Sequence, residues 1–202
     1  MKQLVVVTAL MAEAVPLVDF YRMDKLIKNA DYHHYRVERD PGQLQLDLLV
    51  CGLGADRAQR AILAYLKQPG LARQSCWLNL GIAGARDHEI GELVWAHHVG
   101  GRPVAVPTGV EKTSTAEVVS LAEPGLAYRA GVLFDMEAET CLQTLSENLY
   151  QFSPEQLFCA KVISDNPARG LQQISKQWVT KIIRKQIESL DRHIHNIIST
   201  IE

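Results

Sequence analysis

The sequence predicts an α/β fold of three layers, in which helices cover both faces of a twisted, mostly parallel central sheet. Two observations indicate this arrangement. Apolar runs of strand length recur along the chain and alternate with segments of helical spacing. A long helical pattern at residues 178–198 then extends to the C-terminus, and we expect this helix to cover the sheet. The length fits a single domain over residues 1–202.

The first strand is predicted at residues 4–8, where a β-branched run indicates burial on both faces. A helix is expected over about residues 12–21, and Pro16 is tolerated there because it falls in the first turn. Lys2 and the apolar residues after it loosely imitate a secretory signal, but consecutive valines favour a strand. Glu13 is therefore expected where the first strand ends and a helix begins.

A hairpin is predicted next. Residues 32–39 alternate weakly, Asp40-Pro41-Gly42 marks a turn, and residues 44–51 alternate and then become wholly apolar. The second strand of this hairpin is expected to enter the core.

Gly52-Leu53-Gly54 leads into a helix predicted over residues 55–66, which Pro69-Gly70 ends. A strand, a Gly-x-Gly loop and a helix make half of a dinucleotide-binding fingerprint. The third glycine of that fingerprint is missing, because Arg57 occupies its place, so the pattern is a poor match to a dinucleotide site.

Residues 76–80 predict another buried strand, which opens into a loop of mostly small residues, Gly81, Ile82, Ala83 and Gly84. Small residues let the backbone approach a ligand closely, although a tight turn under a helix has the same composition. Further along, residues 91–95 begin a strand, and residues 104–106 and 118–121 are short strand candidates.

Two later strands end in acidic residues. The apolar run that begins at Val132 stops at Asp135, Met136 and Glu137, and a helical segment follows. The run at residues 157–163 stops at Ser164 and Asp165. Ligand crevices of open α/β sheets lie at such strand ends. Acids also cap helices, so a purely structural role stays open. With Glu13 as a third acid, the pattern favours a carboxylate-lined pocket.

Composition excludes several classes of protein. The chain of 202 residues is 47% hydrophobic and 22% charged, as in soluble domains, and no run reaches the ~18 apolar residues of a membrane span. A net charge of −2 gives no basic face for nucleic acid. The four cysteines are scattered, so we expect buried thiols in a reducing, cytoplasmic environment. The histidines lack the spacing of a zinc site. We therefore expect neither metal nor cofactor.

Several motifs together resemble the superfamily of purine nucleoside phosphorylases and methylthioadenosine/S-adenosylhomocysteine nucleosidases. They occur in the family's order and span most of the chain. They are Ala9-x-x-x-Glu13, Cys51-Gly-Leu-Gly54, Asn79-Leu-Gly-Ile-Ala-Gly84 with Gly91-Glu-Leu-Val, Asp135-Met-Glu-Ala138, and Val162-Ile-Ser-Asp165. The resemblance implies a phosphorylase-like fold, a nucleoside-like ligand and a homodimer or higher homo-oligomer.

The resemblance also implies roles for individual residues. Asp165 would protonate the departing purine, and Glu13 would activate or position the attacking water. Glu137 would bind the ribose hydroxyls while Met136 packs against the sugar. The segment of Gly81, Ile82, Ala83 and Gly84 would lie near the sugar and the base.

The chemistry supports this division of labour. Cleavage of an N-glycosidic bond passes through a sugar cation, which carboxylates stabilise, and a purine leaves poorly unless it is protonated. Phosphorolysis would need an anion cradle of backbone N–H groups and arginine. Glu13 after the first strand would repel phosphate, so water is the expected nucleophile.

The chain also departs from the family pattern. The segment between Gly91 and Asp135 is shorter, Ile82 replaces a small hydroxyl residue, and Glu139 and Thr140 replace small residues. We therefore predict a nucleosidase-like hydrolase of a purine nucleoside or related ribosyl compound. Two alternatives remain at this point: a catalytically impaired nucleoside-binding protein of the same fold, and a phosphate-dependent phosphorylase.

Overall fold

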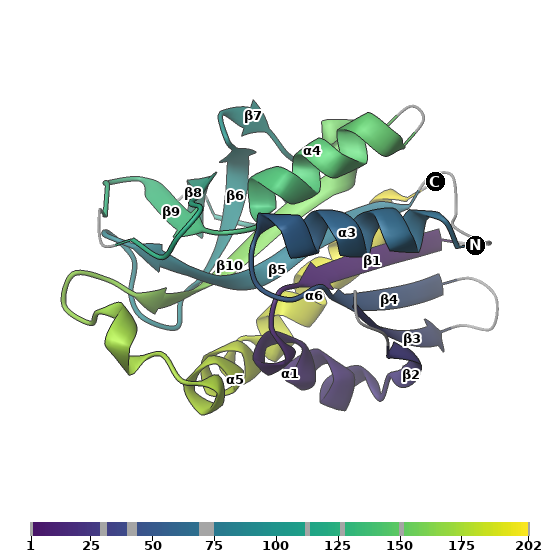
Figure 1. Cartoon of the computed structure of the whole chain (residues 1–202), viewed down its shortest axis with the longest axis horizontal. Coiled ribbons are helices and arrows are strands. Elements are labelled where there is room, and N and C mark those ends of the chain that lie inside the picture. The colour runs from purple at the N-terminus through teal and green to yellow at the C-terminus, as the bar shows by residue number, and fades with distance from the viewer. Residues whose placement is uncertain are drawn as a thin grey trace.

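A central mixed sheet organises the molecule, as the computed structural model in Figure 1 shows. The structure describes residues 2–28, 32–39, 44–68, 75–111, 114–125, 128–149 and 152–201. The predicted turn at Asp40-Pro41-Gly42 and the predicted helix end at Pro69-Gly70 lie outside these residues. The strands are β1 (Lys2–Thr8), β2 (Asp24–Lys28), β3 (His33–Arg39), β4 (Leu44–Val50), β5 (Cys76–Ala85), β6 (Leu93–Val99), β7 (Arg102–Pro103), β8 (Thr115–Ser120), β9 (Val132–Asp135) and β10 (Leu157–Asp165).

Four strands run parallel through the middle of this sheet, in the order β4, β1, β5 and β10. On one side, β3 pairs antiparallel with β4, which confirms the predicted hairpin, and β2 extends it. On the other side, β6, β8 and β9 connect β10 back to β5, which closes a ring of five strands. The carboxyl ends of β1, β4, β5 and β10 therefore lie at one edge.

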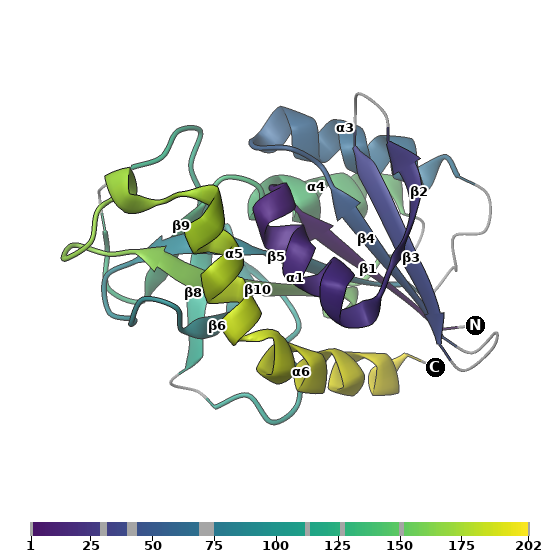
Figure 2. The same cartoon turned by 90° about the horizontal axis from the view of Figure 1, so that it is seen from below.

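Helices cover both faces of the sheet, as predicted. They are α1 (Met11–Tyr21), α3 (Ala55–Leu66), α4 (Ala138–Asn148), α5 (Lys176–Lys185) and α6 (Ile187–Thr200). α1, α5 and α6 pack on one face around one apolar cluster, and α3 and α4 pack on the other around a second. Figure 2 shows the first group of helices from its own side.

The predicted long C-terminal helix is two helices. Gln186 ends α5 and begins α6 with φ −96° and ψ 0°, and its side-chain amide donates to the Gly91 carbonyl at 2.7 Å. Because the sheet is twisted, two shorter helices can each keep an apolar side against it. Ile183 and Ile197 are both fully buried on this face.

Two further expectations are corrected. The small residues at 81–84 continue β5 as strand instead of forming a loop, because both neighbours, β10 and β9, supply backbone partners for them. Residues 104–106 form no strand; Ala105 makes only an isolated bridge with Phe158. All four cysteines are buried free thiols, as expected. Among the described residues, no helix combines the length and apolarity that crossing a membrane requires.

Candidate functional site

Glu13 is buried where β1 meets α1. Its Oε2 accepts hydrogen bonds from the backbone amides of Ala9 at 3.0 Å and Leu10 at 2.8 Å. Its Oε1 accepts from the amide of Ile82 at 3.0 Å, which ties the carboxylate to β5. Burial raises the pKa of Glu13, and the three amides and the charge of Lys161 only partly oppose this.

Glu137 is a second buried carboxylate, at the start of α4. Its Oε1 accepts a hydrogen bond from the backbone amide of Gly54 at 2.7 Å, across 83 residues of sequence. Burial, followed by the charge of Asp135, raises the pKa of Glu137 to about 7, while Lys161 and the Gly54 amide lower it. Since Glu13 also raises this pKa, the two glutamates are close enough to interact.

Lys161 is a buried cation between these acids. Its Nζ donates to Asn79 Oδ1 at 2.6 Å and lies 2.6 Å from Asp135 Oδ2. Burial lowers the pKa of Lys161, but Asp135 and the other negative groups outweigh this, so the net shift is upward and the ammonium is retained. Asp135 also accepts from the hydroxyl of Ser120 at 2.5 Å. The lysine is therefore held in place by two partners.

Gly81 allows these groups to approach each other. It lies opposite Lys161 in the register of β5 and β10. A Cβ atom at this position would lie 3.0 Å from Glu13 Oε1 and 3.6 Å from Lys161 Nζ. A side chain here would press on both charged groups, so the absence of one is a requirement of the packing.

Asp165 lies at the end of β10. Its Oδ2 accepts from the hydroxyl of Tyr128 at 2.7 Å, and its Oδ1 accepts from the hydroxyl of Ser164 at 2.5 Å. An irregularity in the pairing after Ile163 places Asp165 opposite Gly84. A Cβ atom on Gly84 would lie 2.6 Å from Asp165 Oδ2, so this glycine also makes room for an acid.

The carboxyl-terminal half of β5 connects all three acids. Glu13 contacts Gly81 and Ile82, Asp165 lies beside Gly84, and Glu137 interacts electrostatically with Glu13. Gly81 and Gly84 are three residues apart in an extended strand, which spans about 10 Å. Asp165 therefore lies about the length of a nucleoside from Glu13. Met136 is half-buried next to Glu137, and Ala83 packs into the core. The predicted site residues therefore gather at one edge of the sheet.

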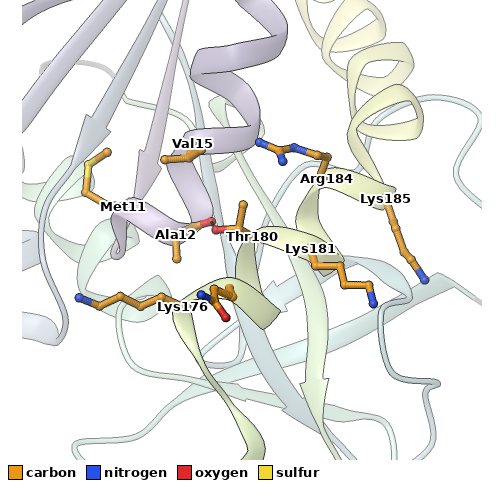
Figure 3. A pocket seen from close by; sticks show the side chains of 9 residues that line it. Met11, Ala12, Val15, Lys176, Thr180, Lys181, Arg184 and Lys185 are labelled. Carbon is orange, nitrogen blue, oxygen red and sulfur yellow. Dashed lines mark hydrogen bonds between the residues drawn. The ribbon is translucent and has the colours of Figure 1, made fainter.

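The three acids are more buried than the predicted carboxylate-lined pocket implied, with exposures of 2% for Glu13, 7% for Glu137 and 2% for Asp165. Their carboxylates are turned to backbone amides and hydroxyls. A hollow of ≈ 440 Å³ lies on the Glu13 side of the site, and its lining includes Cys51 and also Ala9 and Leu10, whose amides bind Glu13. Another hollow, of ≈ 670 Å³, lies between α1 and α5 (Figure 3). None of the predicted site residues lines either one.

Comparison with solved structures gives the fold. The 5′-methylthioadenosine nucleosidase of Arabidopsis thaliana matches with a TM-score of 0.76 and 14% identity, over 98% of this chain and 96% of that one. The nucleosidase (MTAN) of Chlamydia trachomatis, bound to adenine, matches with a TM-score of 0.72 and 20% identity over all of both chains. An MTAN mutant from Helicobacter pylori, with 5′-methylthioadenosine in its active site, matches with a TM-score of 0.71 and 10% identity, over 96% and 99%.

These comparisons show that the chain has the fold of the methylthioadenosine/S-adenosylhomocysteine nucleosidases along its full described length. No protein-family model and no curated protein sequence matches the chain. The fold expectation is thus confirmed from structure, at sequence identities too low for pairwise comparison of sequences to find.

Sequence reasoning missed several residues of this site. Lys161 and Asn79 both stand inside runs predicted as buried strands, and a charged or amide side chain in such a run has to find a buried partner. That signal could have identified them. Tyr128, which donates to Asp165, lies in a segment without a clear pattern and gave no signal.

Proposed function

We propose that this chain is a nucleosidase-like hydrolase that cleaves the N-glycosidic bond of a purine nucleoside or a related ribosyl compound. The fold shared with nucleosidases, one of them bound to adenine, supports this class of ligand. The observation that carries the proposal is the set of three buried acids around the carboxyl-terminal half of β5, two of them with a raised pKa.

Each acid has a distinct task in this reaction. Asp165 delivers a proton to the purine. The protonated base then takes the electrons of the breaking C–N bond and leaves as a neutral molecule. Glu137 binds the ribose hydroxyls and stabilises the sugar cation, and Met136 packs against the sugar. Glu13 accepts a proton from the water whose oxygen bonds to the anomeric carbon. The backbone from Gly81 to Gly84 lies along the sugar and the base.

Water is favoured over phosphate because the backbone donors are already taken. The amides of Ala9, Leu10 and Ile82 bind the Glu13 carboxylate, and the amide of Gly54 binds Glu137. Such amides at a helix N-terminus would otherwise form an anion cradle. A phosphate ion would have to displace two carboxylates of like charge, whereas a water molecule can hydrogen-bond to them.

We also infer a homodimer or a higher homo-oligomer. This inference rests on the resemblance to a family of oligomers; Leu53 and Met11, which are 51% and 36% exposed, are apolar groups that such an interface would bury. Light scattering on a size-exclusion column would give the mass directly. A monomer at micromolar concentration would contradict this inference without touching the hydrolase proposal.

The decisive experiment incubates the protein with purine nucleosides, including 5′-methylthioadenosine, and measures free base by chromatography with and without phosphate. Base release without phosphate is expected. Asp165→Asn should slow it by about 10²–10⁴-fold, the usual contribution of a general acid. Asp56→Asn, an exposed change on α3, is the matched control and should leave the rate unchanged.

Three outcomes would contradict the proposal. Release that needs phosphate would identify a phosphorylase. A nucleoside that raises the melting temperature without being cleaved would identify a binding protein that has lost turnover. An unchanged rate in Asp165→Asn would show that another group protonates the base.

A further inference from the structure

Asp165 has to regain one proton in every cycle of the proposed reaction. It gives a proton to the departing purine, and the neutral base carries that proton away. Glu13 meanwhile takes a proton from the attacking water. After one turnover, Asp165 is therefore one proton short and Glu13 holds one too many. The next turnover requires that Glu13 loses its extra proton and that Asp165 is protonated again.

The two acids cannot exchange this proton directly. Glu13 is bound beside Gly81 and Ile82, whereas Asp165 lies beside Gly84, further along β5. The separation of about 10 Å along the strand is far beyond the length of a hydrogen bond. Both acids are only 2% exposed. The proton that reloads Asp165 therefore comes from solvent, and it needs a group that connects solvent with the buried carboxylate.

Among the described residues, two hydroxyl groups contact the carboxylate of Asp165, those of Ser164 and Tyr128. The Ser164 hydroxyl lies 2.5 Å from Oδ1, but Ser164 is only 1% exposed. Its other partner is the backbone carbonyl oxygen of Ala83 at 3.3 Å, which has no proton to give. Ser164 therefore offers Asp165 no path to solvent.

Tyr128 differs from Ser164 because it reaches both the acid and the solvent. Its hydroxyl donates to Oδ2 of Asp165 at 2.7 Å, and the residue is partly exposed. A phenolic hydroxyl can donate one hydrogen bond and accept another at the same time. Its oxygen can thus accept from a water molecule while its proton points at Asp165, which is the arrangement that a proton relay needs.

Gly84 allows this contact. A Cβ atom on Gly84 would lie 2.6 Å from Asp165 Oδ2 and 3.1 Å from Cε1 of Tyr128, so a side chain here would press on both partners. Because that side chain is missing, the phenol ring and the carboxylate pack over the same point of β5. The hydroxyl therefore stays beside the oxygen to which it donates.

The Tyr128 hydroxyl keeps its own proton. Burial, followed by the hydrogen bond to Asp165 and its negative charge, raises the pKa of Tyr128 above its ordinary value. A long-lived phenolate is therefore unfavourable at neutral pH. Any proton that passes from Tyr128 to Asp165 has to be replaced at once by a proton from solvent.

Building on the hydrolase function proposed above, we propose that Tyr128 is the proton relay that reloads Asp165 between turnovers. The O–H bond of Tyr128 breaks as its proton forms a new O–H bond with Oδ2 of Asp165. The phenolic oxygen takes a proton from hydronium or from a buffer acid at the same time. Tyr128 ends unchanged, Asp165 ends as a neutral carboxyl group, and one proton has moved from solvent to the acid. Tyr128 takes no part in breaking the C–N bond.

The first test separates bond cleavage from reloading. Single-turnover measurements, with saturating protein in excess over 5′-methylthioadenosine or another cleaved purine nucleoside, report cleavage by an acid that is already protonated. Steady-state measurements include the reloading of Asp165. In Tyr128→Phe, the steady-state rate should fall by about ten-fold, while the single-turnover rate should stay within about two-fold of the wild-type value.

Tyr21→Phe is the matched control for this test. The Tyr21 hydroxyl also donates to a carboxylate, that of Asp191 at 2.7 Å, but Asp191 belongs to α6 and has no part in the proposed reaction. The variant loses the same atom and the same kind of hydrogen bond. Both of its rates should equal those of the wild type.

The second test replaces the missing proton donor. Raising the concentration of imidazole buffer at constant pH and ionic strength should increase the steady-state rate of Tyr128→Phe towards the wild-type value, because imidazolium is a small acid that can protonate Asp165. The wild type and Tyr21→Phe should not respond. A defect in the position of Asp165 would not be repaired by buffer, so an unresponsive Tyr128→Phe would contradict the relay.

Failure of the relay is distinguishable from failure of the hydrolase proposal. If the wild-type protein cleaves nucleosides and Tyr128→Phe slows both rates equally, Tyr128 only positions Asp165 and the relay is wrong. If neither rate changes, Asp165 is reloaded by another route, so the relay is wrong while the hydrolase stands. If the wild-type protein cleaves no nucleoside, both proposals are overturned.

Discussion

Two groups of buried carboxylates lie in the same sheet and behave oppositely. One surrounds Asp47 in the middle of β4, and the other consists of Glu13 and Glu137 beside the carboxyl-terminal half of β5. Both are shielded from solvent, so burial alone would raise the pKa of each acid. The number and kind of hydrogen-bond donors decide whether that happens.

Asp47 is completely buried and has four side-chain donors. Gln3 and Gln45 bind its Oδ2 at 2.8 Å and 2.6 Å, and His34 and Arg36 bind its Oδ1 at 2.5 Å and 2.8 Å. Burial raises its pKa, but these four bonds outweigh burial and hold the pKa well below the ordinary value. The carboxylate is therefore a permanent charge, and its role is to join β1, β3 and β4.

Among the described residues, Glu137 has one hydrogen-bond donor, the Gly54 amide, and its neighbours include two more acids, Asp135 and Glu13. Its pKa rises to about 7, near the point at which a group can gain or lose a proton in neutral solution. A buried acid whose oxygens are filled by side-chain donors, a cation among them, is therefore structural, whereas Glu137, which has one amide donor, is available for a ligand or for chemistry.

The largest expected effect comes from the structural group. Asp47→Asn leaves Arg36 and His34 facing a neutral amide and should lower the free energy of unfolding at pH 7 by about 3–5 kcal/mol. Urea denaturation followed by circular dichroism measures this. Because the pKa of Asp47 is lowered by folding, its contribution is present above the unfolded-state pKa and is lost as the pH falls below it. A loss under about 1 kcal/mol at pH 7 would contradict the structural assignment.

Lys161→Met should come next, with a loss of about 3 kcal/mol, because Asp135 then stays buried without its cation. This change also removes a charge that lowers the pKa of Glu13 and of Glu137. Glu13 and Glu137 act in their ionised forms, so the acidic limb of the pH–rate profile should therefore move to higher pH. Lys161→Arg keeps the charge and is the control; an equal shift of the limb in both variants would refute the electrostatic explanation.

Much of this arrangement could be predicted from the sequence, for reasons that differ between residues. Apolar runs predicted β1, β4, the start of β5 and β10, since a strand that is buried on both faces is made mostly of consecutive apolar residues. Glu13, Glu137 and Asp165 could be selected because each follows such a run. The burial of the two glutamates could not be predicted, because it depends on the amides of Leu10, Ile82 and Gly54, which only folding brings near them.

The break at Gln186 and the strand character of Gly81 to Gly84 were also beyond the sequence. The helical spacing continues through Gln186, and only the docking of its side chain on Gly91 marks the break. Small residues predict close approach but do not distinguish a loop from a strand, and here the neighbouring strands decide. In both cases a tertiary contact selects between local structures of similar propensity.

Glu137→Gln should increase the stability of the protein at neutral and higher pH while it reduces the rate of base release. The pKa of Glu137 is raised by folding from 4.5 to about 7, so its contribution is favourable at low pH and is lost as the pH rises through about 7. At pH 8 the variant should be up to about 3 kcal/mol more stable than the wild type, and at pH 4 equally stable. Thermal denaturation at both pH values measures this; a variant less stable at pH 8 would assign Glu137 to the structural group.

Tyr128→Phe should have the smallest effect. It removes one hydrogen bond to Asp165 from a half-buried hydroxyl and should change the rate of base release by about ten-fold or less. The melting temperature should stay nearly constant. A loss as large as that of Asp165→Asn would show that the tyrosine itself takes part in the proton transfer to the base.

The most direct test of this difference between buried acids is a titration of side-chain carboxyl carbons by nuclear magnetic resonance, with Glu137→Gln and Asp47→Asn to assign the signals. Glu137 should titrate with a midpoint near pH 7, and Asp47 should not titrate at any pH at which the protein stays folded. A Glu137 midpoint near its ordinary value of 4.5 would contradict the claim that the acids beside β5 are held ready for chemistry.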